Sequence, residues 1–282
     1  MYKAKFIADS GKEYIFGPSG GTAFDMDVGE GLAVDLSTVQ GFSQVGGAVE
    51  HMSVGGRTIT VKGVIFGDIP EGKRKMRNAF APFVSGTLIF NDSYSIRVYV
   101  KSSPAFSPVK NDGKFSMQLY APVPFFSSLA EKQYYIGAVR PMFRFPVNYA
   151  VPHQFGKTME QRIVNALNEG DAKVPLNMRI EAKGPCANIV VTNLETFEFV
   201  KFNGSMDMGD YIRLWRDEFN VLNAELVSDD EITDILSWID DESTLFELNM
   251  GDNLISTTDD NNGANLSITI TFNPRAVSVY EA

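Results

Sequence analysis

Residues 57–66 read RTITVKGVIF, a run in which apolar and polar side chains alternate. Alternation with a period of two is the pattern of a strand that buries one face. The same pattern returns at 87–90 and at 94–100, which Asn91-Asp92-Ser93 joins as a tight turn, and again at 114–120. The first half of the chain is therefore predicted to be rich in strands.

One short amphipathic helix is predicted between these strands, over residues 72–83. Four apolar residues recur there at spacings of three and four, with basic side chains on the other side: Met76, Ala79, Phe80 and Phe83. Pro82 lacks a backbone donor and disfavours helical geometry in the residue before it. The helix is therefore expected to end at Pro82.

The second half of the chain shows the strand pattern again, in runs separated by Gly, Asn and Asp turn signals. The runs are 176–183, 188–192, 196–202, 211–216, 244–248, 253–256 and 265–272. Short strands with this punctuation favour an antiparallel sandwich over a parallel sheet covered by helices. Ser228 and Glu231 have the spacing of a capping box, which predicts one or two helical turns through Ile232, Ile235, Leu236 and Ile239.

The segment 121–156 differs from both halves because prolines and aromatic residues are interleaved in it. They are Pro122, Pro124, Phe125, Phe126, Pro141, Phe143, Phe145, Pro146, Tyr149, Pro152 and Phe155. Prolines favour extended backbone and aromatic rings need a surface to pack on, so we predict a clamped connector. The boundary is placed inside it, which gives a first domain over 1–135 and a second, with the connector, over 136–282.

Composition and charge exclude several classes of protein. A chain of 282 residues, 44% hydrophobic and 21% charged, has the size and balance of about two globular domains. No run approaches the length of a membrane span, and the first nine residues lack the apolar core of a signal peptide, so folding in the cytosol is expected. The net charge of −10 argues against a protein that binds nucleic acid by neutralising its phosphates. An acidic wall suits a conduit that DNA passes without sticking, although the same charge also keeps ordinary proteins soluble.

Residues 67–74 (GDIPEGKR) match a phosphate-binding loop at all positions except the last. That position must carry Ser or Thr to hold magnesium, but here it is Arg74. Pro70 also removes one of the N–H groups that would cradle a phosphate. We interpret the segment as a turn that leads into the helix.

Two acidic segments are candidates for metal or glycosidase chemistry. If Gly263 is the sixth position of a calcium loop, Thr258 and Thr269 stand where Asp and Glu are required, so we interpret 259–263 as a polar hairpin turn. The carboxylates Glu225, Asp229, Asp230, Glu231, Asp234, Asp240, Asp241 and Glu242 are numerous, but nothing in the sequence places two of them across a cleft. A solvated charged face is expected there.

One cysteine and two histidines cannot form an intramolecular disulfide or the usual structural zinc site. No pattern ties Cys186 to His51 or His153, so a thiol nucleophile is not predicted. We expect no catalytic residues, no metal and no cofactor, and therefore a protein that is not an enzyme. Aromatic platforms for a sugar could come from Trp215 and Trp238, but Trp215 alternates with arginines and is expected to face the core together with Tyr211.

The order of these pieces over nearly the whole chain resembles the distal tail proteins of siphophages, the tail-component family of phages and prophages of Gram-positive bacteria. In the first half the resemblance rests on GGRTITVKGVIF at 55–66, the helix through 77–80 with Pro82, GTL at 86–88, YSIRV at 94–98 and PVPFF at 122–126. In the second half it rests on FP at 145–146, FG at 155–156, NEGD at 168–171, Pro175, MRIEAKG at 178–184, NIVVTN at 188–193, MGDYI at 208–212, FELNMGDNL at 246–254 and SITITF at 267–272.

This resemblance implies an N-terminal domain that forms a hexameric belt and a C-terminal β-sandwich of galectin-like shape. It also implies a structural hub in the virion tail tip, made in the cytoplasm of the bacterial host. Such rings join the tail tube to the tail-tip protein, which is a tail-associated lysin in some phages, leave a channel for DNA, and anchor receptor-binding proteins. The family has no catalytic residues to transfer.

The sequence is also compatible with two other functions. The sandwich could belong to a carbohydrate-binding adhesion protein that recognises host cell-wall glycans, and such a protein should bind glycans as a monomer. An enzyme acting on wall polymer would need a carboxylate or metal constellation, which the sequence does not display. Within the first domain, the segment 17–56 carries spaced apolar residues that we expect to lie on a neighbouring copy: Phe24, Val28, Leu32, Val34, Leu36 and Phe42.

Overall fold

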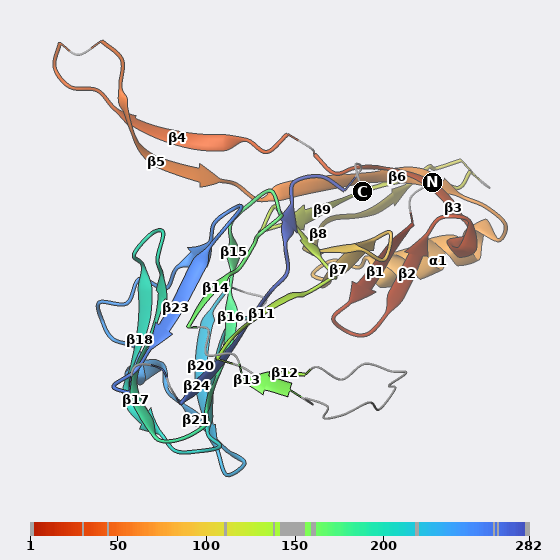
Figure 1. Ribbon diagram of the computed structural model, residues 1–282. Coiled ribbons are helices and arrows are strands. Elements are labelled where there is room, and N and C mark those ends of the chain that lie inside the picture. Colours follow the sequence, from red (N-terminus) through yellow and green to blue (C-terminus); the bar gives the residue numbers. More distant parts are fainter. Residues whose placement is uncertain are drawn as a thin grey trace, which may run out of the picture. The chain divides into compact units, whose positions relative to one another are not determined.

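The structure is a computed structural model that describes residues 3–279 apart from 30, 44, 110–111, 138, 142–155, 159–161, 218–219, 262 and 264. The chain forms two compact units: unit 1 is Met1–Ala130 with Arg275–Ala282, and unit 2 is Glu131–Pro274. Both units consist mainly of antiparallel strands, which confirms the predicted fold class (Figure 1). No helix in the described part of the chain has the length and apolar character to span a membrane.

Unit 1 is built on a nine-stranded antiparallel sheet with the order β2-β1-β7-β8-β9-β6-β3, to which β10 and β25 add beside β8. The strands are β1 Ala4–Ala8, β2 Glu13–Phe16, β3 Thr22–Asp27, β6 Arg57–Ile65, β7 Ser85–Phe90, β8 Tyr94–Phe106, β9 Lys114–Ala121, β10 Phe126–Ser128 and β25 Arg275–Ala276. A short 3-10 turn, η1 Pro18–Gly20, links β2 to β3. The strands predicted at 57–66, 87–100 and 114–120 are confirmed.

The alternation in β6 buries one face of the sheet. Ile59 and Val61 are fully buried, and they belong to a core that also holds an aromatic cluster. In that cluster Phe6 stacks on Phe80 with 4.6 Å between the ring centroids. Gly63 breaks the apolar alternation because a Cβ there would lie 2.3 Å from the carbonyl oxygen of Ala23. The packing around this position therefore leaves no room for any side chain larger than that of glycine.

The helix of unit 1, α1, spans Ile69–Ala79 and begins earlier than the sequence pattern predicts. Asp68 caps it, because its Oδ1 accepts a hydrogen bond from the backbone N–H of Glu71 at 3.0 Å. Pro70 fits the first turn, where backbone N–H groups have no intrahelical partner. The predicted start at Gly72 missed this turn because the apolar spacing begins only after it.

The buried side of α1 agrees with the prediction for three of its four apolar residues. Met76, Ala79 and Phe80 are at most 4% exposed. The prediction for Phe83 is wrong, because the helix ends at Ala79 and its spacing no longer applies beyond that point. Phe83 is fully exposed.

The C-terminal segment returns to unit 1, which the sequence does not reveal. Phe126 in β10 pairs with Ala276 in β25, and the guanidinium of Arg57 donates to the carbonyl of Val277 at 2.8 Å. The division therefore falls after Ala130 and again before Arg275, whereas the sequence placed one boundary at residue 135. The described part of the predicted connector consists largely of short strands, and its Pro146 and Pro152 lie outside the described residues.

Unit 2 is a sandwich of two antiparallel sheets, as predicted. The six-stranded sheet has the order β11 Lys132–Ile136, β24 Leu266–Phe272, β16 Asn177–Ala182, β19 Tyr211–Arg216, β20 Leu222–Ser228 and β21 Glu231–Asp234. The four-stranded sheet has the order β14 Ile163–Asn165, β23 Leu254–Thr258, β17 Cys186–Asn193 and β18 Phe199–Met206. Two small ladders complete the unit: β12 Val139–Pro141 with β13 Gly156–Thr158, and β15 Val174–Pro175 with β22 Glu247–Leu248.

The core of unit 2 lies between its two sheets. Ile180, Ile212 and Ile268 from one sheet and Val191 and Phe202 from the other are fully buried there. A 3-10 turn, η2 Leu236–Trp238, lies over β18, where a Cβ at Gly204 would meet the Trp238 ring at 2.1 Å. The sandwich thus closes around its own core, independent of unit 1.

The helix predicted after Ser228 is wrong, because Ser228 and Glu231 face each other across a hairpin. The two residues between them, Asp229 and Asp230, have positive φ angles of 47° and 66°. Two positive φ angles in succession belong to the tight turn that matches the twist of a β-hairpin. The Ser-x-x-Glu spacing is therefore that of a strand pair, and only η2 remains of the predicted helical turns.

Candidate assembly surface

A two-stranded arm extends from unit 1 between Val34 and Val54 (Figure 1). Its strands, β4 Val34–Val39 and β5 Ala48–Val54, pair only with each other, with a register shift after Ser37. All thirteen strand residues are exposed. An isolated two-stranded ribbon is marginally stable in water, so the arm needs a surface to lie on.

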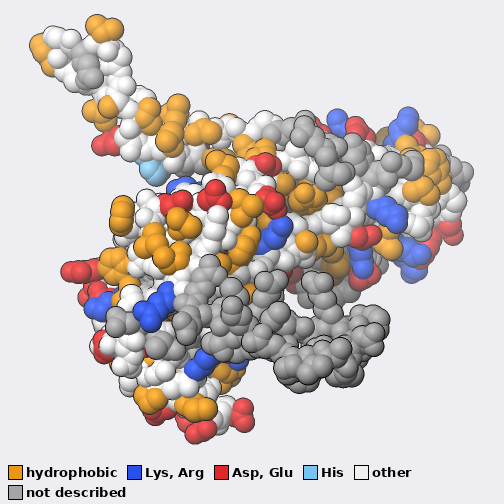
Figure 2. Space-filling view, viewed as in Figure 1, with side chains coloured by type: hydrophobic (Ala, Val, Ile, Leu, Met, Phe, Trp, Pro, Cys, Tyr) orange, Lys and Arg blue, Asp and Glu red, His pale blue; other side chains and the backbone are white. Residues whose placement is uncertain are grey.

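The arm exposes apolar side chains along its strands and at its tip (Figure 2). The exposed residues are Val34, Leu36, Val39, Phe42, Val45, Val49, Met52 and Val54, and Phe42 and Val45 are as exposed as in an unfolded chain. No Asp, Glu, Lys, Arg or His occurs from residue 36 to residue 49. Contiguous exposed apolar surface of this kind marks a protein-binding site.

Of the six apolar residues that the sequence assigned to a neighbouring copy, three lie on the arm, two pack in unit 1, and Leu32 is half-buried between the two groups in the chain. Val34, Leu36 and Phe42 lie on the exposed arm. Val28 is completely buried in unit 1, and Phe24 packs with its ring 5.4 Å from that of Phe16. The prediction for Val28 and Phe24 is therefore wrong, because β3 joins the main sheet, so that Phe24 within it and Val28 directly after it pack on the core of unit 1.

Two strands of unit 1 end the sheet path in the described residues, β2 on one side and β3 on the other. Such edges carry backbone N–H and C=O groups that can pair with another chain. β2 also exposes Ile15 beside the Lys5–Glu13 ion pair, whose nitrogen and oxygen are 2.9 Å apart. Unit 1 thus offers an apolar arm and two open edges.

The former phosphate-loop candidate is the capped start of α1. The carboxylate of Asp68 already occupies the N-terminus of the helix, where a phosphate would have to bind. Arg74 pairs with Glu71 at 2.8 Å on the surface of the helix. These contacts agree with the interpretation of 67–74 as a turn into a helix.

The loop at 259–263 is a turn held by a buried carboxylate. Oδ1 of Asp259 accepts hydrogen bonds from the backbone N–H groups of Asn261, at 2.8 Å, and Gly263. In the part of the chain that the structure describes, no three His, Cys, Asp or Glu side chains gather in a way that could hold a metal ion.

The carboxylates between residues 225 and 242 are spread over hairpins and turns, and those of Glu225, Asp234 and Asp240 make local contacts. Glu225 pairs with Arg213 at 2.6 Å, and Asp240 pairs with Lys201 at 2.9 Å. Hydrogen bonds from the Asn203 amide and from Lys201 lower the pKa of Asp240 to about 2. A carboxyl group with so low a pKa does not act as a general acid near neutral pH.

Cys186 is buried in β17, and desolvation by this burial raises the pKa of its thiol to about 11. His51 lies exposed on β5 of unit 1, and His153 lies outside the described residues. A thiol with a raised pKa is a poor nucleophile, because the thiolate is the reactive form.

The expectation that Trp215 and Tyr211 face the core is wrong. Ile212 and Leu214 are the buried residues of β19, so Tyr211, Arg213 and Trp215 share the opposite face. Arg179 lies 3.6 Å above the Tyr211 ring, and Arg213 lies 5.5 Å from the Trp215 ring. Sequence alternation gave the periodicity of this strand correctly but could not show which phase is buried, because aromatic rings and arginine stems pack on each other.

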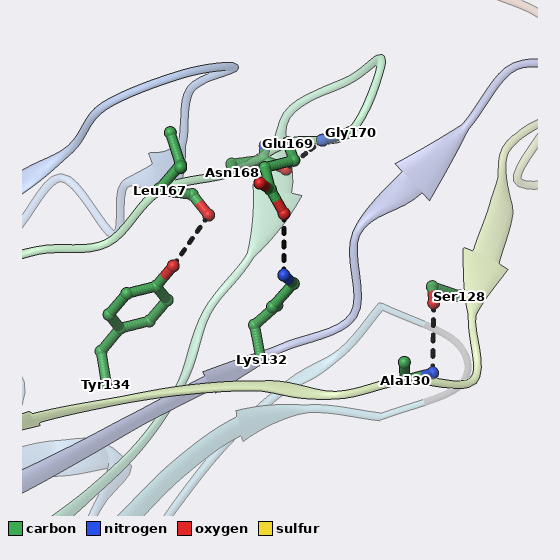
Figure 3. A network of polar contacts seen from close by, with 8 residues as sticks. All are labelled: Ser128, Ala130, Lys132, Tyr134, Leu167, Asn168, Glu169 and Gly170. Carbon is green, nitrogen blue, oxygen red and sulfur yellow. Dashed lines mark hydrogen bonds and ion pairs between the residues drawn. The ribbon is translucent and has the colours of Figure 1, made fainter.

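One motif of the family resemblance, residues 168–171, lies in a loop that polar contacts hold in place. In Figure 3, the hydroxyl of Tyr134 donates to the carbonyl of Leu167 at 3.1 Å, and Lys132 pairs with Glu169 at 2.7 Å. The amide of Asn168 accepts from the N–H of Gly170 at 3.1 Å in the same loop. These residues fix backbone geometry, and sequence reasoning alone assigned them no role.

The chain thus combines a strand-rich unit that carries an exposed arm with a two-sheet sandwich. Residues 169–275, nearly all of them in unit 2, match the family described as siphovirus-type tail component, C-terminal domain. This match and the fold likeness below confirm the resemblance to distal tail proteins. No curated protein sequence matches the chain.

Two solved structures share the fold over nearly the entire chain. The SPP1 Dit protein, described as a paradigm of the hub adsorption apparatus in phages that infect Gram-positive bacteria, is similar with a TM-score of 0.67 and 12% identity, covering 98% of this chain and 99% of that one. A chain of the phage P2 baseplate in its activated conformation with Ca is similar with a TM-score of 0.51 and 15% identity, covering 99% of this chain and 100% of that one. Together with the family match, these likenesses support a structural, non-enzymatic role in a phage tail.

Proposed function

We propose that this chain is the distal tail protein of a phage or prophage and that six copies close into a ring at the tip of the tail. The ring joins the tail tube to the tail-tip protein, leaves a central channel for DNA, and offers its outer surface to receptor-binding proteins. The observation that carries this proposal is the apolar arm of unit 1, which has no core of its own to pack on.

The arm supports ring formation because it supplies the apolar area that a lasting interface needs. A stable contact buries at least about 1,000 Å². Each Val, Leu or Met side chain that moves from water into such a contact contributes about 1.5–3 kcal/mol. The open edges β2 and β3 can pair between neighbours in a closed ring, in which each subunit uses both.

The acidic character of the chain supports a DNA channel that does not bind its cargo. A net charge of −10 on each copy repels the phosphate backbone, and the repulsion is multiplied in a ring. The protein is made in the bacterial cytoplasm and ends in the virion.

A second candidate function, a carbohydrate-binding adhesion protein, is favoured by one observation. The side of β19 that carries Tyr211, Arg213 and Trp215 lies away from the sandwich core, and Glu225 pairs with Arg213 on it. Aromatic rings beside paired donors and acceptors suit a saccharide. The rings are already covered in part by arginines, which makes this the weaker candidate.

One experiment separates the two functions. Light scattering and electron microscopy of the full chain at high concentration should show closed six-membered rings, with or without cell-wall glycans. A chain that stays monomeric and binds wall glycans, with binding lost in Trp215→Ala, would replace the hub by the adhesion function.

A further inference from the structure

The turn after α1 holds a residue of the wrong type for its backbone. The N–H of Val84 donates to the carbonyl of Ala81 at 3.3 Å, which closes a four-residue turn. Pro82 is the second residue of this turn, and Phe83 is the third, with a φ of 67°. Proline at the second position and positive φ at the third are features of a type II turn, whose third residue is normally glycine. A phenylalanine in that conformation is strained.

The strained backbone of Phe83 does not place its side chain in contact with the core of this chain. The side chain is fully exposed, so the residue costs free energy in its backbone and exposes an aromatic ring to water. Backbone strain of this kind gathers at functional sites, so what surrounds Phe83 decides whether it can anchor a partner.

A hollow of about 440 Å³ lies beside Phe83 on unit 1. Its other lining residues are Pro82, Val84, Tyr99, Val100, Lys101 and Ser103. The only charged group of this lining is Lys101, which donates to Thr58 Oγ1 at 3.1 Å. The hollow is therefore mostly apolar, with one cation at its rim.

The arm tip has the complementary chemistry. Phe42 and Val45 protrude fully, and no charged residue lies between 36 and 49. The charged residues that flank this stretch are Asp35 and Glu50, and residues 31–56 contain no Lys or Arg. An acidic segment with an apolar end fits an apolar hollow with a lysine rim. Copies that each carry a net charge of −10 also need contact patches of this uncharged kind.

We infer that the arm tip of one copy seats in the Phe83 hollow of a second copy, with Phe42 packed against Phe83. This inference rests on the proposed ring and names its contact. Donor and acceptor are different patches of the same unit, so the contact is directional and repeats from copy to copy. A directional contact of this kind closes into a ring when its rotation allows.

The test uses cysteines because the chain has a single native one, Cys186, which is buried. Ser43→Cys lies next to Phe42 on the arm, and Ser103→Cys lies in the hollow. Under mild oxidation, a mixture of the two single variants should give disulfide-linked dimers, and neither variant alone should give them. Ser205→Cys, at an exposed position of unit 2, replaces Ser103→Cys as the matched control and should give none.

A pair of glycine substitutions separates anchoring from folding. Phe83→Gly and Phe197→Gly both replace an exposed phenylalanine with positive φ, 67° in unit 1 and 60° in unit 2. Both should leave the melting temperature unchanged or raise it, because glycine tolerates this backbone. Only Phe83→Gly should reduce the yield of the mixed dimer, by about tenfold or more.

The outcomes distinguish the contact from the ring. Rings of the wild-type chain with no mixed dimer, or a mixed dimer unaffected by Phe83→Gly, overturn the contact and leave the proposed function standing. A mixed dimer that forms without rings supports the contact and argues against closure by this chain alone. If neither rings nor mixed dimers form, both the contact and the proposed ring are overturned.

Discussion

Two buried asparagines, Asn168 and Asn253, determine how the loops of unit 2 close. Asn253 is inaccessible to solvent and donates to the carbonyls of Ala166, Asn249 and Gly251 at 2.9 to 3.2 Å, while its Oδ1 accepts from the N–H of Asn249 at 2.8 Å. Buried backbone groups need such partners. Family resemblance singled out these positions, but only the structure shows that they satisfy backbone groups of distant loops.

Asn253→Ala should lower the free energy of unfolding of unit 2 by about 2–3 kcal/mol. The substitution leaves several buried carbonyl and N–H groups without a partner. Both tryptophans of the chain, Trp215 and Trp238, lie in unit 2, so urea denaturation followed by tryptophan fluorescence reports on that unit. Asn223→Ala, which removes one exposed hydrogen bond, is the control and should cost less than about 0.5 kcal/mol. Equal effects of the two substitutions would contradict the assigned role.

The thiol of Cys186 should react with an alkylating reagent only when unit 2 unfolds. Burial raises its pKa to about 11, so the reactive thiolate is scarce at pH 8 and the sulfur is shielded. The measurement is the alkylation rate in rising urea, compared with the unfolding curve from fluorescence. Rapid alkylation of the folded chain would show that β17 opens or that Cys186 is accessible.

Strands with one buried face were predictable, whereas hairpins exposed on both faces were not. Strands such as β6, β7, β9 and β16 bury alternate residues, and the sequence shows this as apolar residues at every second position. The arm has no buried face, so its apolar residues Val34, Leu36 and Phe42 could be singled out, but not its shape. Phe83 was misplaced because helical spacing was extended past Ala79 into the turn. The anchor of the proposed contact is therefore visible only in the structure.

Changing the β20–β21 turn to Asn-Gly, by Asp229→Asn with Asp230→Gly, should stabilise unit 2 by about 0.5–1 kcal/mol. Asn-Gly is the favoured pair where both residues have positive φ, as these two do. Tryptophan fluorescence during urea denaturation measures the change. If the segment were helical instead, glycine would cost about 1 kcal/mol, and a loss of that size would contradict the hairpin.

Acid should weaken the link between β18 and the segment after η2. Asn203 and Lys201 on β18 lower the pKa of Asp240 from its usual 3.8 to about 2. A lowered pKa means that this stabilisation is complete above the unfolded pKa and is lost as the pH falls from about 4 toward 2. Carboxyl NMR titration of the native chain should place the Asp240 pKa near 2, and Asn203→Ala should raise it. An Asp240 pKa that Asn203→Ala does not change would refute the contact.

Pairings that join distant parts of the chain were beyond sequence reasoning. β25 lies near the C-terminus but pairs with β10 in unit 1, and Arg57 holds the adjacent Val277 carbonyl. No local pattern encodes such a return, which is why the predicted boundary at residue 135 and the observed divisions differ. A fragment 1–135 would lack β25, so assembly is best tested with the full chain.

We propose that unit 1 drives ring formation through its arm. Residues 36–52 can be replaced by Asn-Gly between Asp35 and Ser53, which already face each other across the arm. Because the arm pairs with no other sheet in the described residues, this variant should keep the melting temperature of the wild type. The matched control is Ile232→Lys on the exposed edge strand β21 of unit 2.

The deciding measurement is the mass of the three proteins in solution by light scattering, with electron microscopy of any large particles. We expect rings with the mass of six 31.1-kDa chains for the wild type and for Ile232→Lys, and monomers for the variant with the shortened arm. Rings that persist without the arm, or that disappear with Ile232→Lys alone, would contradict it.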